Sequence, residues 1–332
     1  MKLNSIEISF KEICKEDANY MEYFYIYMAT KSILKRYYYP YIRDVNPFFT
    51  DHGEGHIERI FERLYPLLRP HLLTDDEPIS PQSRKDINSD KMSEKINAYD
   101  LYLLMCSVLW HDTGNLYGRQ GHESKIHKLF SNAKGFLYDE PSAGWIEKIG
   151  RAHSGENAIE QHIEREVLNM EGFTYHPKFL ASLLRIADEL DEDRRRTSNR
   201  IENLPENSKV YWFFCNCTDS IKVEPDSREE KKSKIVIEGR INKSDLFSKY
   251  MKDFEVTAIY EYIYRVDKIN KELFFCGNYM KPFRFRPPDQ LELRLSIVDG
   301  GKTIKLLEEI FNKTFGYNEF FQKHSSTLEA MR

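Results

Sequence analysis

The stretch Leu101–Asn115, LYLLMCSVLWHDTGN, decides both the fold and the candidate site of this chain. Its first ten residues are almost all apolar and predict a buried helix over about residues 97–111. His111 and Asp112 lie at the end of this helix. A buried carboxylate must be paired, hydrogen-bonded or bound to a metal, and an adjacent imidazole suits a divalent metal. The pair therefore predicts one part of a metal site.

Residues that could complete this site lie on both sides of the stretch. Upstream, His52 and His56 belong to a segment that predicts a helix over about residues 51–70, with Thr50 as its cap. On a helix these two histidines share one face, and in its first turns the helix dipole keeps an imidazole neutral and able to bind a metal. The downstream candidates are His122, Glu123, His153, Arg185, Asp188 and Asp191.

Five segments carry these residues in a characteristic order: HGEGHIERI, LWHDTGN, GHE, RAHSGE and LLRIADELD. Together they resemble the HD superfamily of metal-dependent phosphohydrolases, over about residues 50–196. The metal ligands that the resemblance implies are His56 (at the HxxR position), His111, Asp112 and Asp188. His122 and His153 are implied either as ligands of a second ion, or as a general acid and phosphate-contacting groups.

Signatures of individual branches of that superfamily are absent. The chain lacks the adjacent His-His pair and the GYP motif of cyclic-dinucleotide phosphodiesterases. Thr113-Gly114-Asn115 stands where guanosine-tetraphosphate hydrolases carry a Glu-Asp pair, and the proline-rich continuation of dNTP triphosphohydrolases is also missing. The substrate specificity of these branches is therefore not carried over.

The mixed ligand set also predicts the metal and the chemistry. Histidine with carboxylate favours one or two ions of Mn, Fe, Co or Zn over an all-oxygen Mg site, although Mg remains compatible. Such ions activate water and screen phosphate charge. The predicted catalytic residues are Asp112, which binds or bridges the ions, His122 and, as a general base, Glu123. A solvated glutamate at a helix start is the alternative reading of Glu123.

Basic residues beside the motifs are candidates for binding phosphate, because an arginine fork matches phosphate oxygens. The predicted substrate-binding residues are His52, Arg119, Arg151, Arg185 and Arg194. His52 could instead orient a ligand, act as an extra ligand or make a structural hydrogen bond, and the run Arg194–Arg196 could be a solvated face. The expected substrate is a nucleotide or another phosphorylated small molecule.

The fold class expected is mainly α: an HD-type all-helical core over residues 1–204, with an N-terminal aromatic helix, followed by a small α+β domain over residues 205–332. Further helices of the core are predicted over residues 18–43, 122–134, 142–153, 156–169 and 177–194, with a polar loop over 74–94. In the second domain, VYWFFCNC (210–217), SIKVEP (220–225), KIVIEGRI (234–241) and LELRLSIV (291–298) predict strands, and residues 243–273 and TIKLLEEIFNKTF (303–315) predict helices.

Composition limits the partners and the compartment. The 332 residues carry a formal net charge of −4, which gives no global attraction for nucleic acid, although the basic-aromatic run KPFRFRPP (281–288) resembles single-strand binders. The longest apolar run, Leu101–Trp110, is too short to cross a bilayer, and we expect no membrane association. Five cysteines without a CxxC pair favour a cytoplasmic location. A homo-oligomer is compatible with the sequence.

Three functions remain open from the sequence. The leading hypothesis is a metal-dependent phosphohydrolase that cleaves a phosphoester or phosphoanhydride bond of a nucleotide or signalling nucleotide with metal-activated water. An HD nuclease is an alternative that needs a basic groove, which the net acidity does not favour. A regulatory or binding module with an idle HD core is the third, because the α+β domain carries no substrate signature.

Overall fold

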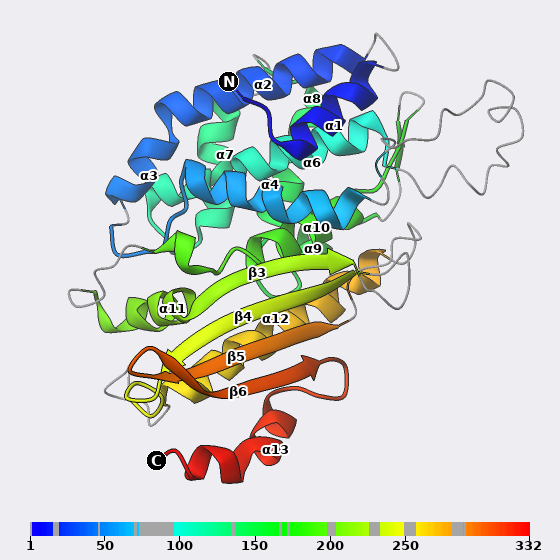
Figure 1. Cartoon of the computed structure of the whole chain (residues 1–332). Helices are drawn as coiled ribbons and strands as arrows, with labels where there is room; N and C mark the ends of the chain where they lie inside the picture. The colour runs from blue at the N-terminus through cyan, green and yellow to red at the C-terminus, as the bar shows by residue number, and fades with distance from the viewer. Residues whose placement is uncertain are drawn as a thin grey trace, which may run out of the picture. The chain divides into compact units, whose positions relative to one another are not determined.

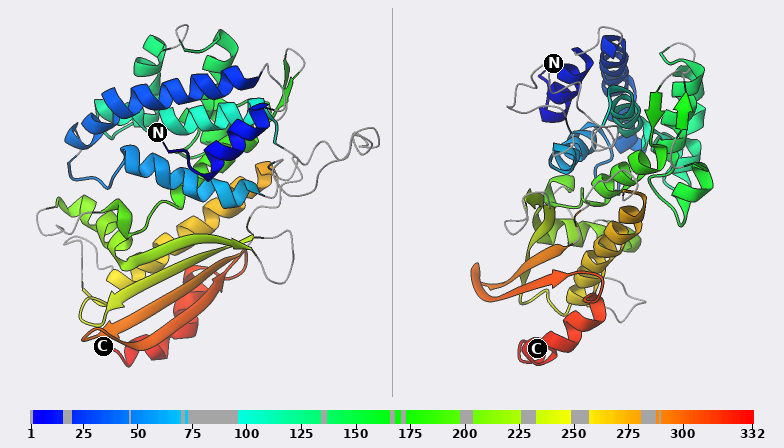
Figure 2. Two further views of the ribbon diagram at one scale, coloured as in Figure 1. Left: turned by 45° about the horizontal axis from the view of Figure 1, so that its top comes forward. Right: turned by 90° about the vertical axis from the view of Figure 1, so that its right-hand side faces the viewer.

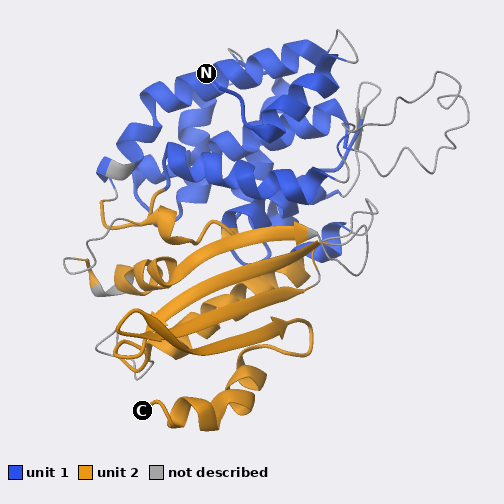
Figure 3. Ribbon diagram, in the orientation of Figure 1, with its two compact units in different colours: residues 1–46, 52–188, 276–286 blue, residues 47–51, 189–275, 287–332 orange. Residues whose placement is uncertain are grey.

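The structure of the chain is a computed structural model that describes residues 2–15, 20–45, 47–69, 72, 96–133, 137–165, 168–170, 173–197, 204–225, 233–248, 257–280, 288 and 290–332. The chain divides into two compact units (Figure 3). Unit 1 comprises Met1–Asn46, His52–Asp188 and Cys276–Arg286, and unit 2 comprises Pro47–Asp51, Glu189–Phe275 and Pro287–Arg332. The domain boundary predicted between residues 204 and 205 stays a prediction.

Unit 1 is mainly helical, as expected (Figure 1). Its elements in chain order are α1 (Ser5–Lys15), α2 (Met21–Tyr37), α3 (Tyr39–Val45), α4 (Glu54–Leu68), α6 (Ala98–Trp110), the 3-10 helix η3 (Thr113–Tyr117), α7 (His122–Ala133), α8 (Glu140–Arg151), α9 (Ala158–His162), the strands β1 (Leu168–Met170) and β2 (Phe173–Tyr175), and α10 (Pro177–Glu189), whose last residue belongs to unit 2.

Helix α6 is the centre of unit 1 because it is buried on every side. Each of its residues, from Ala98 to Trp110, is buried, and the helix packs against α2, α4 and α8. The side chain of Asn97 caps its first turn by accepting a hydrogen bond from the Asp100 backbone N–H at 2.7 Å. Burial of a large apolar side chain contributes about 1.5–3 kcal/mol, so this packing fixes the position of α6 within the unit. Its end places His111 inside the unit.

Unit 2 is built around a four-stranded sheet. Its elements are η4 (Arg194–Arg196), α11 (Glu206–Cys217), β3 (Thr218–Pro225), β4 (Ser233–Asn242), α12 (Ala258–Met280, in unit 2 as far as Phe275), β5 (Leu291–Asp299), β6 (Lys302–Phe311) and α13 (Tyr317–Glu329). The strand order is β3-β4-β5-β6, in which β4 and β5 are parallel and the other two pairs antiparallel. A parallel pair needs a crossover connection, which α12 provides on one face of the sheet (Figure 2).

The two faces of the sheet differ in chemistry. Along β5, leucine and isoleucine side chains alternate into the core, whereas Glu292 and Arg294 point the other way and pair with charged side chains such as Lys234. On β4, a Cβ atom at Gly239 would lie 2.1 Å from the hydroxyl oxygen of Tyr262 on α12. A glycine at this position therefore lets the helix approach the sheet closely.

Two of the elements predicted for the second domain are wrong. The segment 210–217, predicted as a strand from its aromatic residues, lies in helix α11, where tertiary packing that buries Trp212, Phe213 and Phe214 overrides strand propensity. The segment 303–315, predicted as a helix, forms strand β6 over Lys302–Phe311 and pairs antiparallel with β5. The helix predicted over 243–273 begins only at Ala258.

Helix boundaries in unit 1 also differ from the predictions. Helix α4 begins at Glu54 with Gly53 at its cap position, so Thr50 is not the cap and His52 lies outside the helix. The helix predicted over 156–169 is only the short α9, followed by the β1–β2 pair. The helix predicted over 177–194 ends at Glu189, so Asp191 does not extend its face.

Two predicted segments, the loop 74–94 and residues 281–287 of the basic-aromatic run, lie outside the described residues. The aromatic helix predicted over 18–43 is divided into α2 and α3 at Tyr38, two residues before Pro40.

Among the helices that the structure describes, none is both long enough and apolar enough to span a bilayer.

Candidate metal centre

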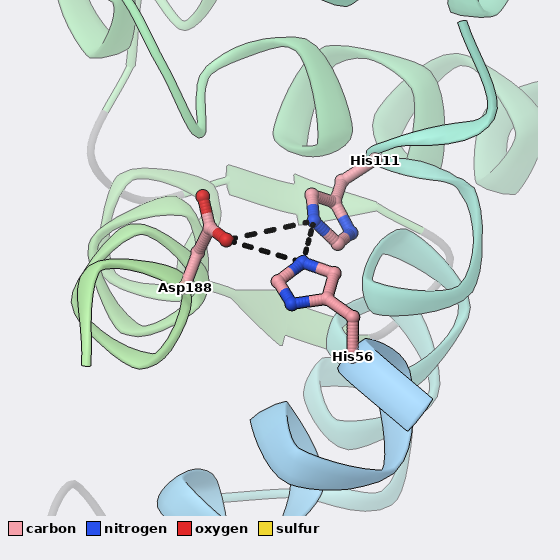
Figure 4. A group of neighbouring side chains, drawn as sticks. All are labelled: His56, His111 and Asp188. Atoms are coloured by element: carbon pink, nitrogen blue, oxygen red, sulfur yellow. Dashed lines mark hydrogen bonds and ion pairs between the residues drawn. The ribbon is translucent and has the colours of Figure 1, made fainter. Parts of the chain in front are cut away.

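The ends of three elements of unit 1 bring one group of donors together. His56 lies in the first turn of α4, His111 follows the last residue of α6, and Asp188 stands near the end of α10. Figure 4 shows the two imidazoles and the carboxylate pointing toward one another. The Nε2 atom of His56 lies 3.2 Å from Nε2 of His111 and 3.2 Å from Oδ1 of Asp188. Their candidate ligand atoms lie within 4.8 Å of one another.

Asp112 connects this group to a second one. Its Oδ2 atom lies 3.3 Å from Nε2 of His56 and 3.5 Å from Nε2 of His111. Its other oxygen, Oδ1, lies 3.0 Å from Nε2 of His122 and 3.8 Å from Nε2 of His153. The two latter nitrogens are 3.1 Å apart. One carboxylate thus faces a different pair of imidazoles with each of its oxygens.

Three of the imidazoles are held in the same way by the backbone. Each Nδ1 atom lies within hydrogen-bond distance of a carbonyl oxygen three residues earlier: His111 to Val108 at 2.8 Å, His122 to Arg119 at 3.2 Å and His153 to Gly150 at 2.6 Å. A carbonyl only accepts, so in each ring Nδ1 carries the proton and donates. With Nδ1 donating to a carbonyl, each ring turns its Nε2 atom toward the cluster, where its lone pair can bind a metal.

The surroundings favour the same protonation states. Burial lowers the pKa of His111, and burial together with the neighbouring His111 and His122 lowers the pKa of His153 to about 3. Burial by itself would raise the pKa values of Asp112 and Asp188, but the polar contacts with the adjacent imidazoles hold both well below the usual range, so both carboxyl groups are ionised. Neutral imidazoles around ionised carboxylates leave buried negative charge that a divalent cation would compensate.

Asn115 is a member of the cluster that the sequence did not single out. Its amide Nδ2 donates to Oδ1 of Asp112 at 2.9 Å, and its Oδ1 lies 3.4 Å from the guanidinium of Arg119. The same Arg119 nitrogen lies 3.3 Å from Nε2 of His122 and 3.8 Å from Oδ1 of Asp112. The signal that could have revealed Asn115 is its position three residues after the aspartate, which on a helical turn brings the two side chains together.

A close backbone approach sets the position of His122. A Cβ atom at Gly114, in η3, would lie 1.9 Å from the backbone oxygen of His122, so only glycine fits at this contact between η3 and α7. The segment that joins them, Tyr117–Gly121, contains Gly118 and Gly121 with φ values of 91° and 63°. Glycine adopts this left-handed backbone without a steric penalty.

The other predicted site residues lie around the cluster or away from it. His52 has its ring centroid 5.6 Å from that of His56. Glu123 approaches His122 at Nδ1, 3.2 Å away, on the side of the ring remote from Asp112. Arg151 pairs with Glu147 on its own helix at 3.6 Å.

Two predicted arginines contact protein groups in the structure. Arg185 donates to the carbonyl oxygen of Gly155 at 2.8 Å, in the loop that follows His153. Arg194 belongs to unit 2 and pairs there with Asp219. The neighbouring Arg195 and Arg196 are also paired with aspartates of unit 2. Their roles in substrate binding remain predictions.

Comparison with known families adds a match over this region. The model of a family described as HD-CE matches residues 47–268, which are 222 of the 332 residues and include both donor groups. No curated protein and no solved structure matches the chain. The match indicates an HD-type domain, in agreement with the resemblance drawn from the five motifs.

Proposed function

The chain belongs to the HD-CE family, and on this premise we propose that it is a metal-dependent phosphohydrolase. Its substrate is a nucleotide or signalling nucleotide, in which it hydrolyses a phosphoester or phosphoanhydride bond. The observation that carries the proposal is the arrangement around Asp112, whose two carboxylate oxygens face two different groups of imidazole nitrogens.

The donors present fit two divalent ions. The residues that would hold the first ion are His56, His111, Asp112 and Asp188, and those that would hold the second are Asp112, His122 and His153. Imidazole and carboxylate together favour Mn, Fe, Co or Zn. The Nε2 atoms of His122 and His153 lie only 3.1 Å apart, and with both Nδ1 atoms donating to carbonyls they repel one another unless a cation lies between them, which supports metal binding by this group.

The chemistry follows from this placement. Divalent ions at such a site activate water near neutral pH and screen the charge of the phosphate. Arg119 is two-fifths exposed and reaches the edge of the cluster, so its guanidinium can bind a phosphate oxygen. Asn115 keeps Asp112 oriented by donating to one of its oxygens. We retain Glu123 as the candidate general base, although its contact with Nδ1 of His122 also suits a residue that orients this ring.

The test combines metal content with turnover. We would purify the chain without a metal-binding tag and measure transition metals by mass spectrometry beside Asp112→Asn and the isosteric control Glu12→Gln, an exposed carboxylate of α1. We expect about two equivalents of metal in the wild type and in the control, with a marked loss in Asp112→Asn. In a screen of nucleotides with Mn²⁺ or Fe²⁺, turnover should fall more than the roughly 100-fold typical of losing a residue that merely supports a ligand.

The outcomes separate the alternatives. Metal binding without turnover on any nucleotide would contradict the enzyme and favour a binding module. Turnover restricted to oligonucleotides would favour a nuclease. Absence of metal in all three proteins after Mn²⁺ or Fe²⁺ is supplied would contradict the metal centre itself.

A further inference from the structure

Lys125 in helix α7 makes an unusual set of contacts with the segment that precedes this helix. Its Nζ atom lies 3.0 Å from the carbonyl oxygen of Tyr117, 3.3 Å from that of Gly118 and 2.7 Å from that of Gln120. An ammonium group has three N–H donors and no acceptor, so these three carbonyls satisfy it completely. The Lys125 ammonium therefore lies in a cage of backbone oxygens. Its N–H groups are engaged there and are not available to bind phosphate.

The caged segment, Tyr117–Gly121, carries two groups that matter to the candidate metal centre. The carbonyl oxygen of Arg119 accepts a hydrogen bond from Nδ1–H of His122. The guanidinium of Arg119 reaches toward Asp112 and Nε2 of His122. The carbonyls of residues 117, 118 and 120 converge on the ammonium, while that of residue 119 turns to the histidine. Any loosening of the cage would move both groups together.

Other hydrogen bonds hold the segment near its two ends, where the Gly118 N–H donates to the carbonyl oxygen of Asn115 at 3.0 Å and the Ser124 hydroxyl donates to that of Gly121 at 2.8 Å. Its two glycines, Gly118 and Gly121, adopt positive φ values, and a flexible glycine segment loses much conformational entropy when it is ordered. A hydrogen bond from a charged donor contributes more to stability than a neutral one. Three such bonds from one ammonium can offset the entropy of ordering these few residues.

We propose that Lys125 is a positioning residue for the second half of the metal centre: its ammonium folds segment 117–121 so that Arg119 and His122 face Asp112. This inference rests on the proposed function. It assigns Lys125 no contact with substrate, and it distinguishes the His122–His153 group, which depends on the segment, from the His56–His111–Asp188 group, which does not.

The test compares Lys125→Met with Lys128→Met. Lys128 lies one turn later on α7 with its Nζ atom 5.1 Å from the ring centroid of Tyr117, so the control removes a lysine that touches the same segment without binding its carbonyls. Calorimetric titration of the metal-free protein with Mn²⁺ gives the affinity of each ion. We expect Lys125→Met to weaken the second ion about 10–100-fold, as loss of an outer-shell partner does, and to leave the first ion unchanged. Lys128→Met should resemble the wild type.

Two further readouts exclude a purely structural role. Amide hydrogen exchange in residues 117–121 should accelerate in Lys125→Met while α4 and α10 keep their protection. In Lys125→Ala, propylammonium should restore much of the affinity for the second ion because it returns an ammonium to the cage, whereas tetramethylammonium, which lacks N–H groups, should not.

The outcomes distinguish this inference from the proposed function. Two ions bound with equal affinity by wild type and Lys125→Met, or unchanged exchange in residues 117–121, would overturn the role of Lys125 and leave the phosphohydrolase proposal standing. Equal weakening of both ions would also overturn it, since that pattern indicates general destabilisation. A wild type that binds no Mn²⁺ would overturn both proposals.

Discussion

The orientation of the Asp112 carboxylate depends on the neighbouring side-chain amide of Asn115. The bond from Nδ2 of Asn115 to Oδ1 of Asp112 leaves this carboxylate one preferred orientation, in which each oxygen faces a different imidazole pair. We expect Asn115→Ala to weaken Mn²⁺ binding about 10–100-fold, because partners that orient a ligand typically have effects of that size. Calorimetric titration of the metal-free variant measures this directly.

A matched substitution separates affinity from stability. Asn97→Ala removes an asparagine of the same unit that caps α6, and it should lower the free energy of unfolding by about 1 kcal/mol while Mn²⁺ affinity stays at the wild-type value. If Asn115→Ala bound Mn²⁺ as tightly as the wild type, the amide would have no part in orienting Asp112.

Residue chemistry is also where the sequence was most informative about the site. A buried His-Asp pair has few purposes besides metal binding, so His111 and Asp112 predicted a metal site. The resemblance to the HD superfamily implied His56 and Asp188 as further ligands, and the structure brings these side chains together. Asn115 and Lys125 could not be identified in this way. An amide or a lysine beside a loop is ordinary in sequence, and only the fold shows that one meets a carboxylate and the other three carbonyls.

Among the elements, the contact between η3 and α7 is the tightest point of the candidate site. We expect Gly114→Ala to displace His122, because its Cβ would lie 1.9 Å from the backbone oxygen of that residue and backbone cannot move as freely as a side chain tip. The overpacking should cost about 1–3 kcal/mol of stability, measured by denaturant unfolding, and metal binding by His122 should weaken with it.

Gly144→Ala is the corresponding control on α8. Its Cβ would meet no atom within 4 Å, and replacing a helical glycine with alanine stabilises by about 0.5–1 kcal/mol. We therefore expect Gly114→Ala to lower the free energy of unfolding and Gly144→Ala to raise it. A Gly114→Ala protein as stable as the wild type, with unchanged metal affinity, would show that α7 tolerates the displacement.

The predicted elements succeeded where pattern and packing agreed. Helix α6 was predictable because a continuous apolar run bounded by Asn97 and a His-Asp pair has few other stable forms. Strand β6 was not, since the doublets Leu306-Leu307 and Glu308-Glu309 imitate helical spacing, and only pairing with β5 selects the strand. Helix α11 was missed for the opposite reason, because its aromatic residues favour strands until tertiary packing buries them.

For the whole molecule, the important fact is that every proposed metal ligand lies in unit 1. A ligand that binds only folded protein stabilises it, by about 2.7 kcal/mol when its free concentration is a hundred times the dissociation constant. We expect the two compact units to unfold in separate thermal transitions. Chelation of the metal should lower the unfolding temperature of unit 1 and leave that of unit 2 unchanged. Differential scanning calorimetry with and without a chelator measures this.

Asp112→Asn provides the control for chelation, since a protein that no longer binds the ions should not respond to the chelator. Without chelator, the unfolding temperature of unit 1 in Asp112→Asn should already lie near that of the wild type with chelator. A chelator that shifted both transitions equally, or shifted the variant as much as the wild type, would indicate an effect unrelated to this centre.

The anchoring of His111, His122 and His153 by carbonyl oxygens three residues earlier has a consequence for how this site could diversify. Main-chain oxygens are shared by all amino acids, so point substitutions at the anchoring positions leave the acceptor in place. Mutation can therefore replace a metal-binding side chain or one of its neighbours while the remaining imidazole rings keep their orientation. Inserting or deleting a residue between a histidine and its acceptor is the step that would reorient a ring, so evolutionary or designed changes in metal preference should more readily preserve this spacing than break it.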